Sequence, residues 1–451
     1  MECSALDCVR PWPDAALCQS QKKVPTKVHG DVIIDFPLTK VVENKWFKRL
    51  AGIKVLGVVE LVYPTACHTL YTVAIGRYRI ASKFLSEHRH VPRNEDRSIW
   101  SLSVCLAAMC LDLAAVPHDY VEYRMRKDKD FKKKIYKQSA RIFEESVFPD
   151  ISEDLNAFSF NQPERILHLT KALICSSSES HDDYVSQKFL YQLFGGYKFP
   201  ITFDRLERLL VNSFFTNVGI ELNERYVCRF LSETNSSLYE KKGEIRFAPK
   251  TPIDIVIWSE MTMMRSVFNH KAVVGFQLKL GLLKCQFTMV AFRIFRAFEL
   301  IEFHIDEDYL GMSWKNPFKF TDSIYRRVLD DCRVNGDRFG IGKLIQDVFE
   351  NREKWRPIRK IPFKGNYGQE EIARLIRQHS NDAIKDSDFA VKVLDDIPSD
   401  IRSSDLFKAH RERQMDVDNE PWIMIYDCSD SRSTGDLLKK IVEQHKLLRT
   451  V

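Results

Sequence analysis

The sequence predicts a mainly α-helical fold with small antiparallel strand elements and a C-terminal α+β lobe. Apolar residues recur at a helical period through most of the chain before residue 366, and the segment 98–115 is hydrophobic nearly all round. After Pro362 the composition becomes more charged and mixed, and two strand-like runs follow at 391–394 and 422–426. We therefore expect three parts, which are a flexible N-terminal tail at 1–26, a helical domain at 27–365 and an α+β lobe at 366–451.

Periodicity also gives the order of the elements. Val32–Ile34 reads as a short strand, and a helix is expected from Leu38 to about Leu50. Residues 234–250 read as a turn and a strand. Further helical patterns occupy 66–87, 98–115, 143–200 with breaks, 203–229, 252–292, 341–355, 369–377 and 434–448.

Composition limits the class of protein. Hydrophobic residues make up 44% of the chain and charged residues 29%, which excludes a disordered or collagen-like protein. A net charge of +6 over 451 residues does not by itself indicate nucleic acid. No apolar run reaches the length of a membrane span, and the N-terminus carries no secretory pattern. Eleven cysteines match no zinc spacing, so we expect an intracellular protein of the nucleus or cytoplasm with no membrane contact.

Several sequence blocks, taken in order, resemble the HD-domain deoxynucleoside triphosphate triphosphohydrolases, known as the dGTP triphosphohydrolase family. The blocks are KVHGDVIIDFPLTKVVENKWFKRLAGIKVLG, LVYPTACHTLYTVAIGRYRIA, LAAMCLDLAAVPHDY, RSVFNHKAV and DSIYRRVL. The resemblance covers about 27–362 and is closest to the SAM-and-HD-domain type, here without a SAM domain. It implies an HD-domain helical core that cleaves a dNTP to a deoxynucleoside plus triphosphate. It also implies one transition metal, which imidazole and carboxylate ligands together suit.

The ligand positions implied by this resemblance are largely lost. The two metal histidines fall at Val73 and Leu111, the aspartate of the His-Asp pair survives as Asp112, and the distant aspartate falls at Asp183. Two further active-site histidines fall at Ala115 and Tyr120, and an arginine near the phosphates falls at Leu70. Apolar replacements leave little to stabilise charge on a transferring phosphate. We therefore expect a degenerate site with no catalytic residue, no cofactor and no transition metal; Asp112 and Asp183 would hold Mg²⁺ only weakly.

Three further features bear on this loss. The dipeptides His118-Asp119 and His181-Asp182 offer replacement ligands, but surface or supporting histidines are the favoured interpretation. His68 is expected to be hydrogen-bonded structure. Asp112 lies in an apolar segment, and a buried carboxylate needs a partner. It is either a relic ligand or a structural anion paired with an arginine or a backbone N–H, and we favour the second interpretation.

Nucleotides bound at two regulatory sites assemble active members of the family. The guanine-reading residues of the first site fall at Glu43, Lys48 and Ala51, so a bidentate arginine is lost. In the second site Arg246, His270 and Lys271 remain, whereas a family arginine falls at Glu260. The sequence does not favour nucleotide-driven tetramers, and homo-oligomers formed by other contacts stay open.

A basic run lies at 123–141. Its nucleic-acid candidates are Arg126, Lys132, Lys133, Lys134 and Lys137. The run fits contact with a phosphate backbone, a solvated helix face or a nuclear import segment. We favour the solvated face.

Three functions follow from these features. The first is a pseudoenzyme, dNTPase-like in fold, that acts by binding a protein or nucleic-acid partner. The second is an active dNTP triphosphohydrolase with a rearranged metal site that uses Asp112, Asp183 and His118. The third is a nucleotide-binding sensor without hydrolysis that uses Arg246, His270 and Lys271. We rank them in this order.

Overall fold

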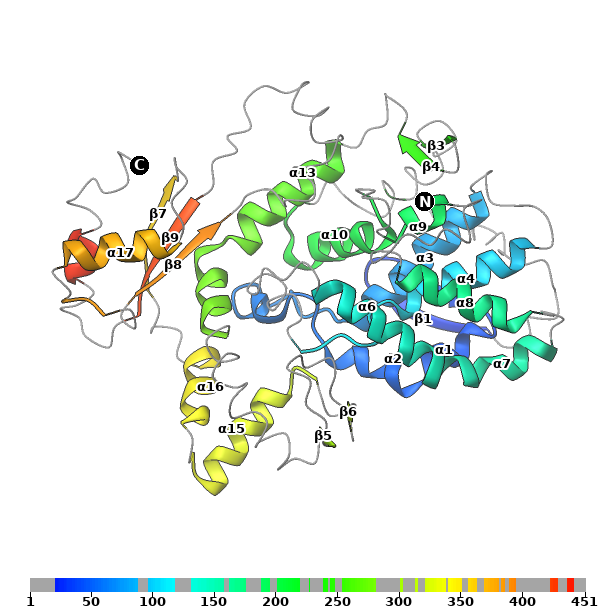
Figure 1. The fold of residues 1–451 in the computed structure, drawn as a ribbon, viewed down its shortest axis with the longest axis horizontal. Coiled ribbons are helices and arrows are strands. Elements are labelled where there is room, and N and C mark those ends of the chain that lie inside the picture. Colours follow the sequence, from blue (N-terminus) through cyan, green and yellow to red (C-terminus); the bar gives the residue numbers. More distant parts are fainter. Residues whose placement is uncertain are drawn as a thin grey trace. The chain divides into compact units, whose positions relative to one another are not determined.

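The structure is a computed structural model of the 451-residue chain. It describes residues 21–87, 96–117, 131–157, 162–175, 188–194, 201–219, 227, 238–241, 244–247, 254–280, 301–302, 313–314, 321–337, 340–350, 356–362, 369–380, 383–385, 389–394, 422–428 and 436–441. In these residues helices dominate and the strands are short and antiparallel, which confirms the predicted fold class (Figure 1). None of the described helices has the length and apolar character needed to cross a membrane.

The chain forms two compact units. The first unit contains residues 1–57, 65–259 and 299–323, and the second contains 58–64, 260–298 and 324–451. The domain boundary predicted between 365 and 366 lies inside the second unit, and it stays a prediction.

The first unit begins with a β-hairpin of β1, Lys22–Thr26, and β2, Gly30–Ile34. Pairing with β2 gives order to residues whose own periodicity is weak, so β1 lies in the stretch that the sequence assigned to the tail. The single helix predicted over 38–50 is two helices, α1 (Leu38–Glu43) and α2 (Lys45–Arg49). Asn44 separates them because its backbone is extended, and its side-chain oxygen caps α2 by accepting the Trp46 N–H at 2.8 Å.

Two long helices carry the core of the first unit. They are α3, Leu70–Glu87, and α4, Asp96–Cys110. Every residue of α4 from Trp100 onward is buried, and α4 packs against both α3 and α8. This confirms the predicted central buried helix.

The remaining elements of the first unit surround these helices or form small hairpins. They are α6 (Phe131–Ile142), a π-helical turn (Phe143–Val147), α7 (Phe148–Ala157), α8 (Pro163–Ile174), α9 (Lys188–Gln192), α10 (Phe203–Thr216), and the hairpins β3/β4 (Leu238–Lys241, Glu244–Phe247) and β5/β6 (Ile301–Glu302, Ser313–Trp314). The helix α13 (Asp254–Met263) crosses from the first unit to the second.

The second unit is built around a three-stranded antiparallel sheet with the order β7-β9-β8. Its elements are a π-helical turn (Met264–Phe268), a helix at 271–280, α15 (Ile324–Asn335), α16 (Ile341–Phe349), β7 (Arg356–Pro362), α17 (Gln369–His379), β8 (Phe389–Leu394), β9 (Trp422–Asp427) and a helical segment at 436–441. Strands β8 and β9 confirm the two predicted strand-like runs. Strand β7 was not predicted, because its prolines and charges are typical of an edge strand.

Candidate functional site

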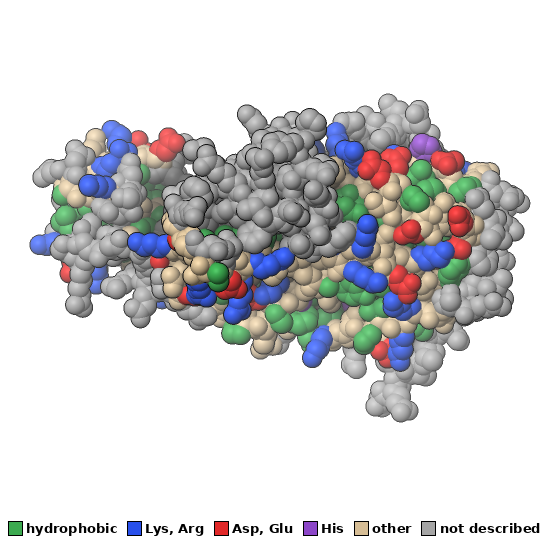
Figure 2. Space-filling model, turned by 90° about the horizontal axis from the view of Figure 1, so that it is seen from below, with side chains coloured by type: hydrophobic (Ala, Val, Ile, Leu, Met, Phe, Trp, Pro, Cys, Tyr) green, Lys and Arg blue, Asp and Glu red, His purple; other side chains and the backbone are tan. Residues whose placement is uncertain are grey.

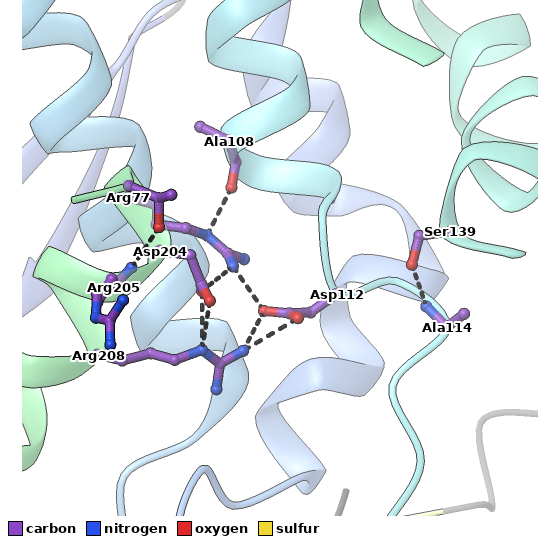
Figure 3. A network of polar contacts seen from close by, with 9 residues as sticks. Arg77, Ala108, Asp112, Ala114, Ser139, Asp204, Arg205 and Arg208 are labelled. Atoms are coloured by element: carbon purple, nitrogen blue, oxygen red, sulfur yellow. Dashed lines mark hydrogen bonds and ion pairs between the residues drawn. The ribbon is translucent and has the colours of Figure 1, made fainter. Parts of the chain in front are cut away.

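Asp112 lies in the turn after α4, and its carboxylate contacts two arginines (Figure 3). Arg77 of α3 brings Nη1 to 2.8 Å from Oδ2, and Arg208 of α10 donates from Nη2 to Oδ1 at 3.1 Å and to Oδ2 at 2.9 Å. Both carboxylate oxygens therefore accept hydrogen bonds from guanidinium groups. Asp112 is paired in the way that the structural interpretation expects.

A second carboxylate completes the centre. Asp204, at the start of α10, accepts from Arg77 Nη1 at 2.6 Å and from Arg208 Nε at 2.8 and 3.0 Å. Arg77 Nε also donates to the Ala108 carbonyl at 2.9 Å. We call Arg77, Asp112, Asp204 and Arg208 the quartet. It holds two positive and two negative charges, so it is neutral as a whole.

The quartet is largely buried, so the pairing of its charges matters for the stability of the fold. The Arg77 side chain is 0% exposed. Burial alone would lower the pKa of Arg77, but the Asp112 and Asp204 carboxylates outweigh it and hold that pKa above its ordinary value. Arg77 is therefore charged, and its charge depends on both carboxylates.

Arg49 and Ser139 also form hydrogen bonds with the backbone of the turn after α4. Arg49 donates from Nη1 to the Leu113 carbonyl at 3.2 Å and from Nη2 to the Ala115 carbonyl at 2.6 Å. The Ala114 N–H donates to Ser139 Oγ at 3.0 Å. Burial lowers the pKa of Arg49 to about 10, which still leaves it protonated at neutral pH. The polar backbone groups of this turn are thus bonded to the protein itself.

Four positions that the resemblance assigns to imidazole or guanidinium groups carry buried apolar side chains. Leu70, Val73, Leu111 and Ala115 are all buried among other core residues. The other candidates of the predicted site, which are Tyr120, Asp183 and the dipeptides at 118–119 and 181–182, lie outside the described residues.

His68 is hydrogen-bonded, as predicted, and its partner Asn212 lies one helical turn after Arg208 on α10. Its Nε2 lies 2.8 Å from Asn212 Oδ1, and its ring stacks on Phe215 with centroids 4.7 Å apart. Burial lowers the pKa of His68 to about 4, and the Arg208 charge acts in the same direction while the bond to Asn212 opposes it. The ring is neutral at pH 7 and serves as a packed, hydrogen-bonded group.

This lowered pKa makes the stability of the fold depend on pH. The unfolded chain takes up a proton at His68 near pH 6.5, well before the folded chain does, so stability falls as pH drops from about 6.5 towards 4. Between pH 7 and pH 5 this group should remove about 2 kcal/mol from the free energy of unfolding. Urea unfolding measures this free energy at the two pH values. Its decrease from pH 7 to pH 5 should be about 2 kcal/mol smaller in His68→Gln than in the wild type. The exposed His168→Gln should keep the full loss of the wild type, and equal losses in all three proteins would contradict the assignment.

The quartet does not suit a transition metal. It offers carboxylate oxygens only, and each of these oxygens already accepts from a guanidinium. The imidazole nitrogens that favour Fe, Mn or Zn are missing at positions 73 and 111. Across the part of the chain that the structure describes, no group of three His, Cys, Asp or Glu residues is arranged to hold a metal ion.

Sequence reasoning missed most of this centre. Arg77, Asp204 and Arg208 were not singled out, nor was the buried pair of His29 with Glu207, whose Nε2 and Oε2 lie 2.8 Å apart. One local signal was available, because Asp204 and Arg208 have the i, i+4 spacing of a helical ion pair. Nothing in the sequence indicates that this pair meets Asp112.

The regulatory nucleotide candidates show ordinary surface contacts. Glu43 is exposed and lies 3.3 Å from Lys22 Nζ, and Lys48 is exposed on α2. In the second unit, the His270 ring lies 6.0 Å from the Tyr63 ring, and Lys271 is exposed. Burial and then the Lys271 charge lower the pKa of His270. The backbone of Arg246 lies in β4, and its side chain is outside the described residues.

The basic run forms helix α6 over its described part. Ile135, Tyr136 and Ala140 are buried, whereas Lys137 is exposed and Lys133 and Lys134 are half-buried. Arg141 pairs with Glu145 at 2.8 Å, and nearby Glu144 pairs with Lys171 at 2.6 Å. Within the run, Arg141 therefore has an intramolecular partner, and the solvated-face interpretation stays a prediction. Arg126 and the Lys132 side chain lie outside the described residues.

In Figure 2, over the part of the surface that is described, basic and acidic side chains are interspersed across the broad right-hand region. A sequence-independent grip on a phosphate backbone needs clustered positive charge.

Comparison with known proteins supports an HD-domain relationship. The chain is 25% identical over 374 residues to a protein of Acanthamoeba polyphaga mimivirus named as HD domain-containing, and the match covers 78% of this chain and 76% of that protein. It is 27% identical over 199 residues to an uncharacterized protein of Mycoplasma pneumoniae, a match that covers 43% of each. No family model matches the chain.

The fold is also shared with a solved structure. A hypothetical protein from Aquifex aeolicus has a crystal structure that aligns with a TM-score of 0.63 at 14% sequence identity. The alignment covers 94% of this chain and 100% of that one. At this identity the likeness shows a common fold.

Proposed function

We propose that this protein is a pseudoenzyme of HD-domain type, which keeps the helical scaffold and acts by binding a partner. One observation carries the proposal. Asp112 is the residue that the resemblance places at the aspartate of the His-Asp pair. Arg77 and Arg208 together contact both of its carboxylate oxygens. The positive charge of these guanidinium groups opposes the approach of a metal cation.

The chemistry of dNTP cleavage supports the same conclusion. Hydrolysis needs a cation or a set of donors directed at the charge that develops on the phosphate. The two arginines of the quartet are neutralised by carboxylates, and the positions that the resemblance assigns to histidines carry the buried apolar side chains of Val73, Leu111 and Ala115. We therefore expect the centre to contribute to stability and not to dNTP cleavage.

The partner is proposed to be a protein or a nucleic acid, met in the nucleus or cytoplasm, and homo-oligomers are compatible with this role. A nucleotide sensor ranks below a protein-binding role, because an arginine of the first regulatory site falls at Ala51 and one of the second falls at Glu260.

Metal content and turnover test the proposal directly. Protein purified without chelator should hold Fe, Mn and Zn at well below one ion per chain by elemental analysis. The same sample should release no triphosphate from any of the four dNTPs, before or after incubation with each metal. Nucleotides should also fail to raise the melting temperature, which a bound ligand would raise according to its concentration and Kd.

Two results would contradict the proposal, each in its own way. Stoichiometric metal with turnover that Asp112→Asn abolishes would establish the rearranged active site. Stabilisation by a nucleotide without turnover would instead establish the sensor.

A further inference from the structure

The segment 321–323 is bound to the rest of the first unit just before the chain passes into the second unit. The Asp322 N–H donates to the Gly52 carbonyl at 3.0 Å, and Asp322 Oδ2 accepts the Lys54 N–H at 2.6 Å. Thr321 packs against the same turn, because a Cβ on Gly52 would lie 2.6 Å from Thr321 Cγ2 and 2.9 Å from Thr321 Cβ. Backbone bonds and close packing together dock this segment.

Both sides of this contact lead directly into the second unit. The first unit includes residues 1–57 and 299–323, and the second unit begins at Val58 and again at Ile324. The two hydrogen bonds of Asp322 therefore join two passages of the chain between the units. A displacement of one passage acts on the other through Asp322.

Arg49 connects this contact with the turn after α4. Its guanidinium is buried and donates to the carbonyls of Leu113 and Ala115, close after Asp112. Burial lowers the pKa of Arg49, and the charge of Asp322 acts in the opposite direction, so Asp322 favours the charged guanidinium. A buried cation is costly without negative charge nearby. If the segment moves away, Arg49 loses part of that support and its two bonds to the turn weaken.

We propose that the segment 321–323 and the turn after α4 form one coupled device, in which undocking of the segment loosens the turn through Arg49. Such coupling is reciprocal, so an event that holds the turn also holds the segment in place. The device regulates whatever the turn at Asp112 does. It goes beyond the proposed function and does not depend on it, because a partner-binding protein and an enzyme could both use it.

Hydrogen exchange followed by mass spectrometry measures the turn directly. The N–H groups of residues 113–115 all donate hydrogen bonds within the first unit, so their exchange reports opening of the turn. Asp322→Asn keeps the backbone donor of the segment and removes its charge, and exchange at 113–115 should rise by about tenfold. The matched control is Asp330→Asn, the same substitution at an exposed pair with Arg333. It should leave exchange at 113–115 unchanged.

A steric substitution tests the coupling without a change of charge. Gly52→Ala places a Cβ against Thr321 and should displace the segment, because both Cβ and Cγ2 of Thr321 would be too close. Exchange at 113–115 should rise as it does in Asp322→Asn. Thr321→Gly removes the collision, so the double variant Gly52→Ala/Thr321→Gly should exchange no faster than Thr321→Gly alone.

Arg49→Met shows whether the coupling runs through Arg49. This substitution alone should speed exchange at 113–115, and Asp322→Asn should then add nothing to it. Additive effects would overturn the inference, and so would equal exchange in Asp322→Asn and Asp330→Asn. If exchange in α8 rises as much as exchange at 113–115, the whole unit opens, which also contradicts a device confined to the turn. Metal content and turnover do not enter these measurements, so the proposed function can fail or stand independently.

Discussion

Replacement of Arg77 with methionine should lower the free energy of unfolding by about 3–5 kcal/mol, which is the usual cost of removing one partner from a buried ion pair. Methionine keeps most of the apolar stem, so the loss reports the guanidinium and not a cavity. Asp112 and Asp204 would then lose the guanidinium that contacts them both, and the Ala108 carbonyl would lose the Arg77 Nε donor. Urea denaturation at pH 7 measures this difference.

The matched control is Arg141→Met. Arg141 also pairs with a carboxylate, but both side chains are exposed to solvent, where ion pairs contribute little. Its free energy of unfolding should stay close to that of wild type. Equal effects of the two substitutions would mean that the quartet does not hold α3, α4 and α10 together.

The helices of the first unit could be predicted because residues that are buried in a helix recur in the sequence as apolar residues at a helical period. The apolar run at 98–115 has no polar face, and it becomes the buried α4. The break at Asn44 escaped the same reasoning, since apolar periodicity continues on both sides of it and only the backbone conformation ends α1. Strand β1 escaped it because pairing with β2, and not its own composition, makes it a strand.

The centre could be predicted only in part. The loss of imidazole at positions 73 and 111 is visible in the sequence once the resemblance is given, and so is the need of Asp112 for a partner. The identity of that partner is not visible, because Arg208 lies 96 positions further along the chain. The acidic residue that the structure brings beside Asp112 is Asp204, whereas the resemblance pointed to Asp183, which lies outside the described residues.

Gly76 should be the least replaceable glycine near this centre. A Cβ at this position would lie 1.9 Å from Glu207 Oε1 and 2.2 Å from Glu207 Cδ, far inside contact distance. Glu207 cannot easily move, because it is fully buried and its Oε2 lies 2.8 Å from His29 Nε2. Gly76→Ala should therefore lower the free energy of unfolding by about 3 kcal/mol, the upper range for an overfilled core.

A double-mutant cycle separates this collision from any general intolerance of α3. In a Glu207→Ala background the carboxylate is gone, and an alanine at position 76 has the space that it lacks in the wild type. Gly76→Ala should then be neutral or should stabilise by about 1 kcal/mol, because alanine favours the middle of a helix over glycine. The coupling measured between the two sites by urea unfolding should be several times larger than the usual deviation of independent sites. If Gly76→Ala costs the same in both backgrounds, the packing of α10 against α3 at Glu207 is not what fixes glycine at this position.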